Sequence, residues 1–225
     1  MKISENGSPV EPEVKQKPAA VEVHRLIKRF GNFTAINDIS LKVFPGEVHA
    51  LLGDNGAGKS TTFRSIVGLH RPSSGSVEVC GLDLHCDRIG ALASLGYVGQ
   101  DAPLYQYLTG EELLRLVGRL HDLTEEQLET RLQLLTKMLG LHSAQKRLVR
   151  EYSGGMAQKL AIAAAIIHEP PLILLDEAFT GLDPESTEAI RSHLDTLREA
   201  GAAVLLSSHV LDMLERWVTR VVIID

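Results

Sequence analysis

The stretch Gly53-Asp54-Asn55-Gly56-Ala57-Gly58-Lys59-Ser60-Thr61 follows directly on the apolar run VHALL at 48–52. That run predicts a buried strand, and the small residues after it allow successive backbone N–H groups to converge on one anion. The stretch therefore predicts a phosphate-binding loop (P-loop) between a strand and a helix that begins at Lys59. A glycine-rich turn that merely joins the two elements is the alternative, and the complete motif in this context disfavours it.

The P-loop favours a polyphosphate as its ligand. Lys59 would neutralise charge on the β- and γ-phosphates, and the hydroxyl of Ser60 would take one position around Mg²⁺, which prefers hard oxygen ligands. We therefore expect a Mg–nucleoside triphosphate. GTPases, kinases, motor ATPases and transport ATPases all carry such a loop, so the motif alone leaves the function open.

The composition limits the classes of protein to which the chain can belong. The chain has 225 residues, 44% of them hydrophobic, which suits one large α/β domain or a core domain with an insert. A formal net charge of -6 argues against general binding to nucleic acid. Cys80 and Cys86 are too few to form a four-ligand zinc site alone. The longest apolar runs, such as 160–167, fall short of the about 18 residues that span a bilayer.

Apolar spacing predicts the order of elements. Residues 1–19 lack any period and are expected to form a flexible tail, so the folded domain would cover 20–225. Two alternating strands precede the P-loop strand, and the P-loop helix is expected to run to about Leu69. Further strands are predicted at 77–84 as a hairpin, at 95–100, at 172–175, at 203–206 and at 221–224. A helix over 184–200 is predicted between the strands at 172–175 and 203–206.

The composition changes between the P-loop and the strand at 172–175. Apolar residues recur every three or four positions across about 104–152, with Thr109 and Thr124 as predicted helix N-caps and Gly140 as a stop. We expect a helical insert there. The predicted fold class is therefore α/β, a P-loop NTPase core with N-terminal antiparallel strands and an inserted α-helical subdomain.

Two carboxylates, Asp176 and Glu177, end the strand at 172–175. The carboxyl ends of strands are where ligands sit in open α/β sheets. Asp176 would hold Mg²⁺ through water, and Glu177 would polarise the water that attacks the γ-phosphate. The alternative is an acidic helix N-terminus favoured by the helix dipole.

The stretch Tyr152-Ser153-Gly154-Gly155-Met156 precedes a strongly apolar helix. Its backbone N–H groups and serine hydroxyl predict a second anion site. A helix-capping serine followed by flexible glycines is the alternative.

The order of these motifs resembles the nucleotide-binding domain of ABC transporters. GDNGAGKST, Gln100 after a strand, YSGGM, ILLDE, GLD (181–183) and His209 occur in the family's order, and the resemblance extends from about Val21 to Asp225. It implies an ATPase subunit that pairs head to tail with a second ATP-binding domain, in a homodimer or a heterodimer, each ATP lying between the P-loop of one domain and the SGG signature of the other. Transmembrane permease subunits would be separate chains, and the protein would lie at the cytoplasmic face of the membrane.

The resemblance also implies residue roles. Phe30 would stack on adenine, Gln100 would reach Mg²⁺ and the attacking water, Asp183 would link the two sites, and His209 would contact the γ-phosphate. The implied catalytic residues are Lys59, Gln100, Glu177 and His209. The implied metal ligands are Ser60, Gln100 and Asp176. The implied ATP contacts are Phe30, Gly53, Asp54, Asn55, Gly56, Ala57, Gly58, Lys59, Ser60, Thr61, Thr62, Ser153, Gly154, Gly155 and Asp183.

The sequence departs from the family pattern at Met156, Asp54, Gly99 and Ala178, where Gln, Pro, Pro and Pro are usual. None of these changes removes a catalytic group, although Met156 removes one polar contact. The insert and the segment DAPLYQYLTGEELL (101–114) resemble exporter-type subunits. A non-transport ABC ATPase acting on ribosomes or DNA, and an ATP-holding regulatory module, remain the alternatives. Family members usually continue past the last strand, which is compatible with a natural chain longer than 225 residues.

Overall fold

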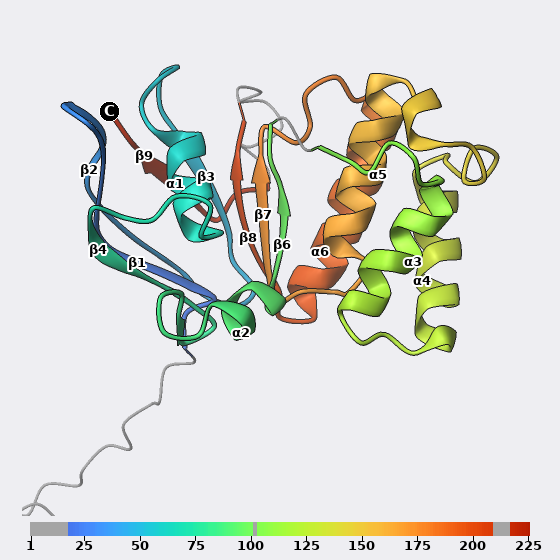
Figure 1. Cartoon of the computed structure of the whole chain (residues 1–225), viewed down its shortest axis with the longest axis horizontal. Coiled ribbons are helices and arrows are strands. Elements are labelled where there is room, and N and C mark those ends of the chain that lie inside the picture. The colour runs from blue at the N-terminus through green and yellow to red at the C-terminus, as the bar shows by residue number, and fades with distance from the viewer. Residues whose placement is uncertain (1–17, 101–102, 209–216) are drawn as a thin grey trace, which may run out of the picture.

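Two sheets organise the chain, and the computed structural model describes residues 18–100, 103–208 and 217–225 of it (Figure 1). The antiparallel sheet has the strand order β2-β1-β4-β5, and the parallel sheet has the order β6-β7-β8-β3-β9. The antiparallel strands are β1 (Val21–Phe30), β2 (Phe33–Val43), β4 (Ser74–Val79) and β5 (Leu82–Asp83). The parallel strands are β3 (Val48–Leu52), β6 (Leu95–Val98), β7 (Leu172–Asp176), β8 (Ala203–Ser207) and β9 (Arg220–Ile223).

Helices pack against both sheets. They are α1 (Lys59–Ile66), α2 (Arg88–Ala93), α3 (Gly110–Leu120), α4 (Glu125–Met138), α5 (Gly154–Ile166) and α6 (Pro184–Glu199), with a 3-10 turn at Val149–Glu151. Figure 1 shows α1 between the two sheets, and α3 to α6 on the other side of the parallel sheet. The predicted α/β fold with N-terminal antiparallel strands is confirmed.

The parallel strands are buried on both faces, as their continuous apolar runs predict. In β7, Ile173 and Leu175 pack into the core that faces α5 and α6, whereas Leu172 and Leu174 pack into the core beneath the antiparallel sheet. All four side chains have no exposed surface. The central strands are therefore held from both sides, and the loops at their ends are attached to a rigid support.

The helices predicted in the 104–152 region are present, and each begins where the sequence indicates. Thr109 and Thr124 both form capping boxes, with Glu112 and Gln127 as the reciprocal partners. Gly140, two residues after α4, adopts a positive φ of 66°, which glycine tolerates best.

The prediction for the end of the P-loop helix is wrong. The helix α1 ends at Ile66 rather than near Leu69, because Gly68 adopts φ 68° and its N–H bonds to the carbonyl of Ser65. The apolar residues Val67 and Leu69 on either side conceal this boundary in the sequence. The strand predicted to reach Gln100 likewise ends two residues earlier, at Val98.

The parallel strands bring distant segments to one edge of the sheet. Because β6, β7, β8 and β3 are adjacent and parallel, the residues that follow each of them meet at their carboxyl ends. The P-loop follows β3, Glu177 follows β7, and Gln100 lies just past β6. The sheet thus collects segments from across the sequence into one place.

Candidate nucleotide-binding site

The P-loop has the close packing that its glycines permit. Gly58, the N-cap of α1, has φ 96°, and a Cβ there would lie 2.5 Å from the carbonyl oxygen of Ala35. A Cβ on Gly53 would collide with the carbonyl of Ile224. Side chains are therefore excluded at both positions, and the loop presents backbone toward the helix N-terminus, where an anion is favoured.

Lys59 is nearly buried at 7% exposure. Its ammonium donates to the carbonyl oxygens of Gly53 and Asp54 at 2.7 and 3.0 Å. Carbonyl groups of the P-loop therefore hold the positive charge of Lys59 at the centre of the loop. Thr62, predicted as an ATP contact, is directed differently: it is fully buried, and its hydroxyl donates to the carbonyl of Gly58 at 2.9 Å.

Asp176 is fully buried at the end of β7. Its Oδ1 accepts a hydrogen bond from the hydroxyl of Ser207, at 2.8 Å, on the neighbouring strand. Its Oδ2 has no hydrogen-bond partner among the described residues. A buried carboxylate oxygen without a partner is costly, and it suits a ligand that brings a metal ion or its water. Asp176 therefore fits the part of a Mg²⁺-holding residue.

Glu177 adopts a positive φ of 54°, which is unfavourable for a side chain of this kind. The backbone N–H of Glu177 donates to both the hydroxyl and the carbonyl of Ser207, at 3.0 and 3.2 Å. These contacts hold the strained conformation, as is common at functional sites. The amide Nε2 of Gln100 lies 3.4 Å from Glu177 Oε2, so the structure brings these two predicted residues together.

The helix dipole does not account for the two acidic residues. The helix that follows them, α6, begins at Pro184, seven residues after Glu177. Asp176 belongs to the strand, and the segment between is a turn. The alternative of an acidic helix N-terminus is therefore wrong for this pair.

The signature residues open α5. Ser153 is the N-cap, and its hydroxyl accepts from the N–H of Met156 at 3.3 Å. The capping alternative thus describes the local structure. Ser153 and Gly154 are exposed, and space around the Cβ position of Gly154 is open. An exposed helix N-terminus remains available to an anion.

Two adjacent residues of α5 fasten the segment that follows Glu177. Gln158 Nε2 donates to the carbonyl of Ala178 at 2.8 Å. The ammonium of Lys159 lies 2.8 Å from Asp183 Oδ2. Asp183 also caps α6 by accepting from the N–H of Ser186. The hydrogen bond from Lys159, followed by those from Ser186, holds the pKa of the Asp183 carboxyl far below its usual range.

Phe30 is 45% exposed at the end of β1. Its ring meets His70 edge-on, with centroids 5.3 Å apart, and the ammonium of Lys28 lies 4.7 Å from its centroid. His70 and Lys28 therefore hold the Phe30 ring in place, and part of its surface remains accessible. His209, the last predicted residue, lies outside the described residues.

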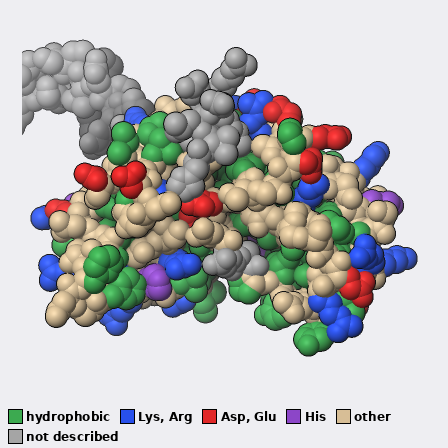
Figure 2. Space-filling model, turned by 90° about the horizontal axis from the view of Figure 1, so that it is seen from above, with side chains coloured by type: hydrophobic (Ala, Val, Ile, Leu, Met, Phe, Trp, Pro, Cys, Tyr) green, Lys and Arg blue, Asp and Glu red, His purple; other side chains and the backbone are tan. Residues whose placement is uncertain are grey.

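Figure 2 looks onto the edge where the strands end. The middle of this face is mostly backbone and uncharged polar side chains, with acidic side chains among them. That distribution matches a site built from glycine-rich loops and a few carboxylates.

Sequence reasoning missed three supporting residues: Ser207, Gln158 and Lys159. Ser207 ends the apolar strand β8, and a polar residue at the end of a buried strand is a signal that could have singled it out. Gln158 and Lys159 lie on α5, a helix that the sequence predicts from its apolar residues. No residue near them in the sequence indicates which groups they bind. Their contacts appear only in the folded chain.

These features define a nucleotide-binding α/β domain with a P-loop. A family model described as ABC transporter matches residues 36–180, more than half of the chain. The chain therefore belongs to the ABC transporter family, as an ATP-binding domain. The resemblance of its motif order to the nucleotide-binding domain of ABC transporters is therefore confirmed.

Curated relatives and solved structures support this assignment to the ABC transporter family. The daunorubicin/doxorubicin resistance ATP-binding protein DrrA of Streptomyces peucetius is 37% identical over 93% of this chain and 64% of that protein. The Nod factor export ATP-binding protein I of Cupriavidus metallidurans is 35% identical over 92% of this chain and 68% of that protein. The structure of an ATP-binding subunit of an ABC transporter matches with a TM-score of 0.88 and 35% identity over 91% of this chain and 85% of that chain.

A dimeric bacterial ABC transporter cassette matches with a TM-score of 0.81 and 26% identity, over 91% of this chain and 94% of that one. The chain spans only part of the length of the curated relatives that it matches, for example 64% of DrrA. Among the described residues, no helix combines the length and apolar character needed to cross a membrane.

Proposed function

We propose that the chain binds Mg–ATP and hydrolyses it to drive transport through separate permease subunits. The observation that carries the proposal is the meeting of the P-loop with Asp176, Glu177 and Gln100 at one edge of the parallel sheet. Family membership and relatives named as ATP-binding proteins for drug resistance and Nod factor export support it.

The P-loop from Gly53 to Thr61 would bind the phosphates, with Lys59 exchanging its two carbonyl partners for phosphate oxygens. Ser60, Gln100 and Asp176 would hold Mg²⁺, which neutralises charge on the phosphates when bound. The partnerless Oδ2 of Asp176 is the feature that favours this assignment. Few protein ligands suffice, because Mg²⁺ keeps several waters and binds the phosphates as well.

Glu177 would accept a proton from the water that attacks the γ-phosphorus, as the bond from that phosphorus to the leaving ADP oxygen breaks. Gln100 is close enough to orient the same carboxylate and water. His209 would contact the γ-phosphate. Phe30 would stack on the base, because an aromatic ring with an accessible face suits a purine.

Ser153, Gly154 and Gly155, of which the first two are exposed, would clasp the ATP of a second copy. A head-to-tail pair would then form two composite sites, with Asp183 between them. The likeness to a dimeric cassette supports this arrangement. Lys159 and Gln158 would pass movement of the signature helix to the residues that follow Glu177.

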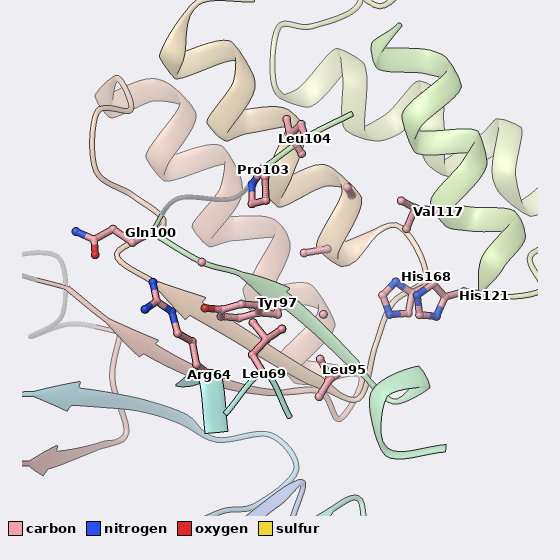
Figure 3. Close-up of a pocket in the computed structure, with 15 residues that line it drawn as sticks. Arg64, Leu69, Leu95, Tyr97, Gln100, Pro103, Leu104, Val117, His121 and His168 are labelled. Carbon is pink, nitrogen blue, oxygen red and sulfur yellow. The ribbon is translucent and has the colours of Figure 1, made fainter. Parts of the chain in front are cut away.

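A groove next to Gln100 is the proposed docking site for the permease. This cavity of about 430 Å³ lies between the end of α1, strand β6, and helices α3 and α5 (Figure 3). Figure 3 shows the guanidinium of Arg64 beside the hydroxyl of Tyr97 at the Gln100 end, and His121 and His168 at the other. The described lining residues include no carboxylate, so the groove suits an apolar helix that carries an acidic residue. Such a partner would hold the chain at the cytoplasmic face of the membrane.

Nucleotide binding and phosphate release by three chains test the proposal. Wild type should bind ATP tightly and release phosphate in the presence of Mg²⁺. Lys59→Ala should lose tight binding. Glu177→Gln should keep it and hydrolyse roughly 10²–10⁴-fold more slowly. Wild-type affinity in Lys59→Ala, or unchanged hydrolysis in Glu177→Gln, would remove the assigned roles.

A further inference from the structure

A group of cations surrounds the turn between α1 and β4. Lys28 and Arg29 come from β1, Arg71 from the turn itself, and Arg88 from the start of α2. Two exposed apolar side chains, Leu69 and Ile89, project beside them at 63% and 85% exposure. We call these six residues the basic turn surface.

Contacts in the structure hold the surface together. The ammonium of Lys28 donates to the carbonyl of Arg71 at 2.8 Å. The guanidinium of Arg71 lies 3.1 Å from Nε2 of His85. A Cβ on Gly68 would lie 3.5 Å from the guanidinium carbon of Arg88, so this charge lies over the end of α1. Three separate chain segments thus contribute to one surface.

The positive charge of the surface is not neutralised by neighbours. None of its four cations forms an ion pair with a described residue, although the whole chain carries a net charge of -6. The two nearby carboxylates serve backbone N–H groups instead: Asp83 accepts from His85 and Cys86, and Asp87 caps α2. The surface therefore attracts anions in a chain that otherwise repels them.

The titration of His70 agrees with this charge. Burial lowers the pKa of His70, and the cations of Lys28 and Arg64 lower it further. A neutral His70 adds no repulsion between the cations at neutral pH.

The surface adjoins the permease groove. Leu69 belongs to both, and its N–H donates to the carbonyl of Arg64, a groove residue on α1. A chain docked through the groove would therefore turn this surface toward the bilayer. Cations around projecting apolar side chains are the combination that binds anionic membrane interfaces.

We propose that the basic turn surface binds the anionic lipid headgroups of the membrane in which the permease lies. Arg29, Arg71 and Arg88 would contact headgroup phosphates, Lys28 would hold the turn through the carbonyl of Arg71, and Ile89 and Leu69 would enter the interface. The orientation rests on the proposed permease docking. Binding of the surface to lipid does not depend on that docking, so the permease proposal and the lipid proposal can fail separately.

Co-flotation of the full chain with permease-free vesicles tests this. Vesicles of phosphatidylcholine with 30 mol% phosphatidylglycerol, a fraction on the order of that in anionic membranes, are compared with pure phosphatidylcholine. We expect binding to the anionic vesicles that weakens as salt rises. Arg71→Gln/Arg88→Gln should lower the partition coefficient about 30-fold, since each basic residue near the surface contributes about 1 kcal/mol. Both residues lie outside the ATP site, so hydrolysis should stay at the wild-type level.

The control is Lys137→Gln/Lys146→Gln, which removes the same charge from exposed positions on and after α4. It should bind within about twofold of wild type. Ile89→Ser should weaken binding without changing its salt dependence. Equal losses in both double variants would overturn the proposal, as would equal binding to the two kinds of vesicle. Tighter binding to single-stranded RNA than to anionic vesicles would assign the surface to nucleic acid instead.

Discussion

Lys159 Nζ lies 2.8 Å from Asp183 Oδ2, joining the helix that begins at the signature to the helix that follows the proposed catalytic carboxylate, Glu177. Together with the hydrogen bond from Gln158 to the carbonyl of Ala178, it holds both ends of the segment 178–183 against α5. These two contacts would transmit a shift of α5 to the residues next to Glu177. This is a direct mechanical link between the proposed clasp for one ATP and the proposed base for the other.

Lys159→Met should raise the pKa of Asp183 toward its ordinary value, because the Lys159 hydrogen bond is the largest cause of its depression. The depressed pKa in the folded state means that the interaction stabilises the fold above about pH 4 and is lost as the pH falls below that. A carboxyl titration followed by NMR in both chains measures the change. An unchanged Asp183 titration would mean that the ion pair does not form in solution.

Ser207→Ala should impair hydrolysis more than ATP binding. The hydroxyl of Ser207 both donates to Asp176 and accepts from the N–H of Glu177, so its loss releases a predicted metal ligand and a predicted catalytic residue at once. We also expect a loss of about 1–3 kcal/mol in the free energy of unfolding, because buried polar groups lose a partner. Ser207→Thr keeps a hydroxyl and is the matched control. Equal kcat values for Ser207→Ala and wild type would contradict this role.

The stability of the chain should decline on mild acidification through His168. Its ring stacks on His121 with centroids 3.6 Å apart, where the end of α3 meets the core. Burial, followed by the neighbouring His121, lowers the pKa of His168 to about 4. Because the unfolded chain then binds a proton more readily, stability falls as the pH drops from about 6.5 towards 4.

Urea unfolding at pH 7.5 and pH 5 measures this decline. After allowance for partial solvent exposure, the loss assigned to His168 should be roughly 1–2 kcal/mol. His168→Phe keeps a stacking ring without a proton to gain, so its loss should be smaller by that amount. Several other groups titrate in the same range, and the difference between the two chains isolates His168. A difference of zero would contradict the assignment.

Local signals in the sequence were sufficient for the strands and for the P-loop. The run at 172–175 is apolar without interruption, and a strand buried on both faces requires that pattern. Thr109 and Thr124 marked the starts of α3 and α4 because capping depends on residues three positions apart. Such features are encoded within a few residues of each other.

The supporting contacts were not predictable in the same way. Ser207 and Asp176 are 31 residues apart and meet only because β7 and β8 are neighbours. Lys159 and Asp183 meet because α5 packs next to the turn before α6. The end of α1 was also missed, since Val67 and Leu69 continue its apolar pattern through Gly68. Tertiary packing decides each of these features.

The central claim is that each ATP site is shared by two copies of the chain, and mixing two inactive variants tests it most directly. Ser153→Arg blocks the signature and leaves the P-loop intact, whereas Lys59→Ala disables the P-loop and leaves the signature intact. Their heterodimer contains one site that lacks both functions and one that keeps both. Ser153→Ala, which lacks the hydroxyl without added bulk, controls for the loss of the helix cap.

We predict that ATP hydrolysis partly recovers when the two variants are mixed, as a composite site requires. Heterodimer formation is checked by pulling down one tagged variant with the other, and folding of each by circular dichroism. Mixtures that form heterodimers yet hydrolyse no more ATP than either variant alone would contradict the shared site.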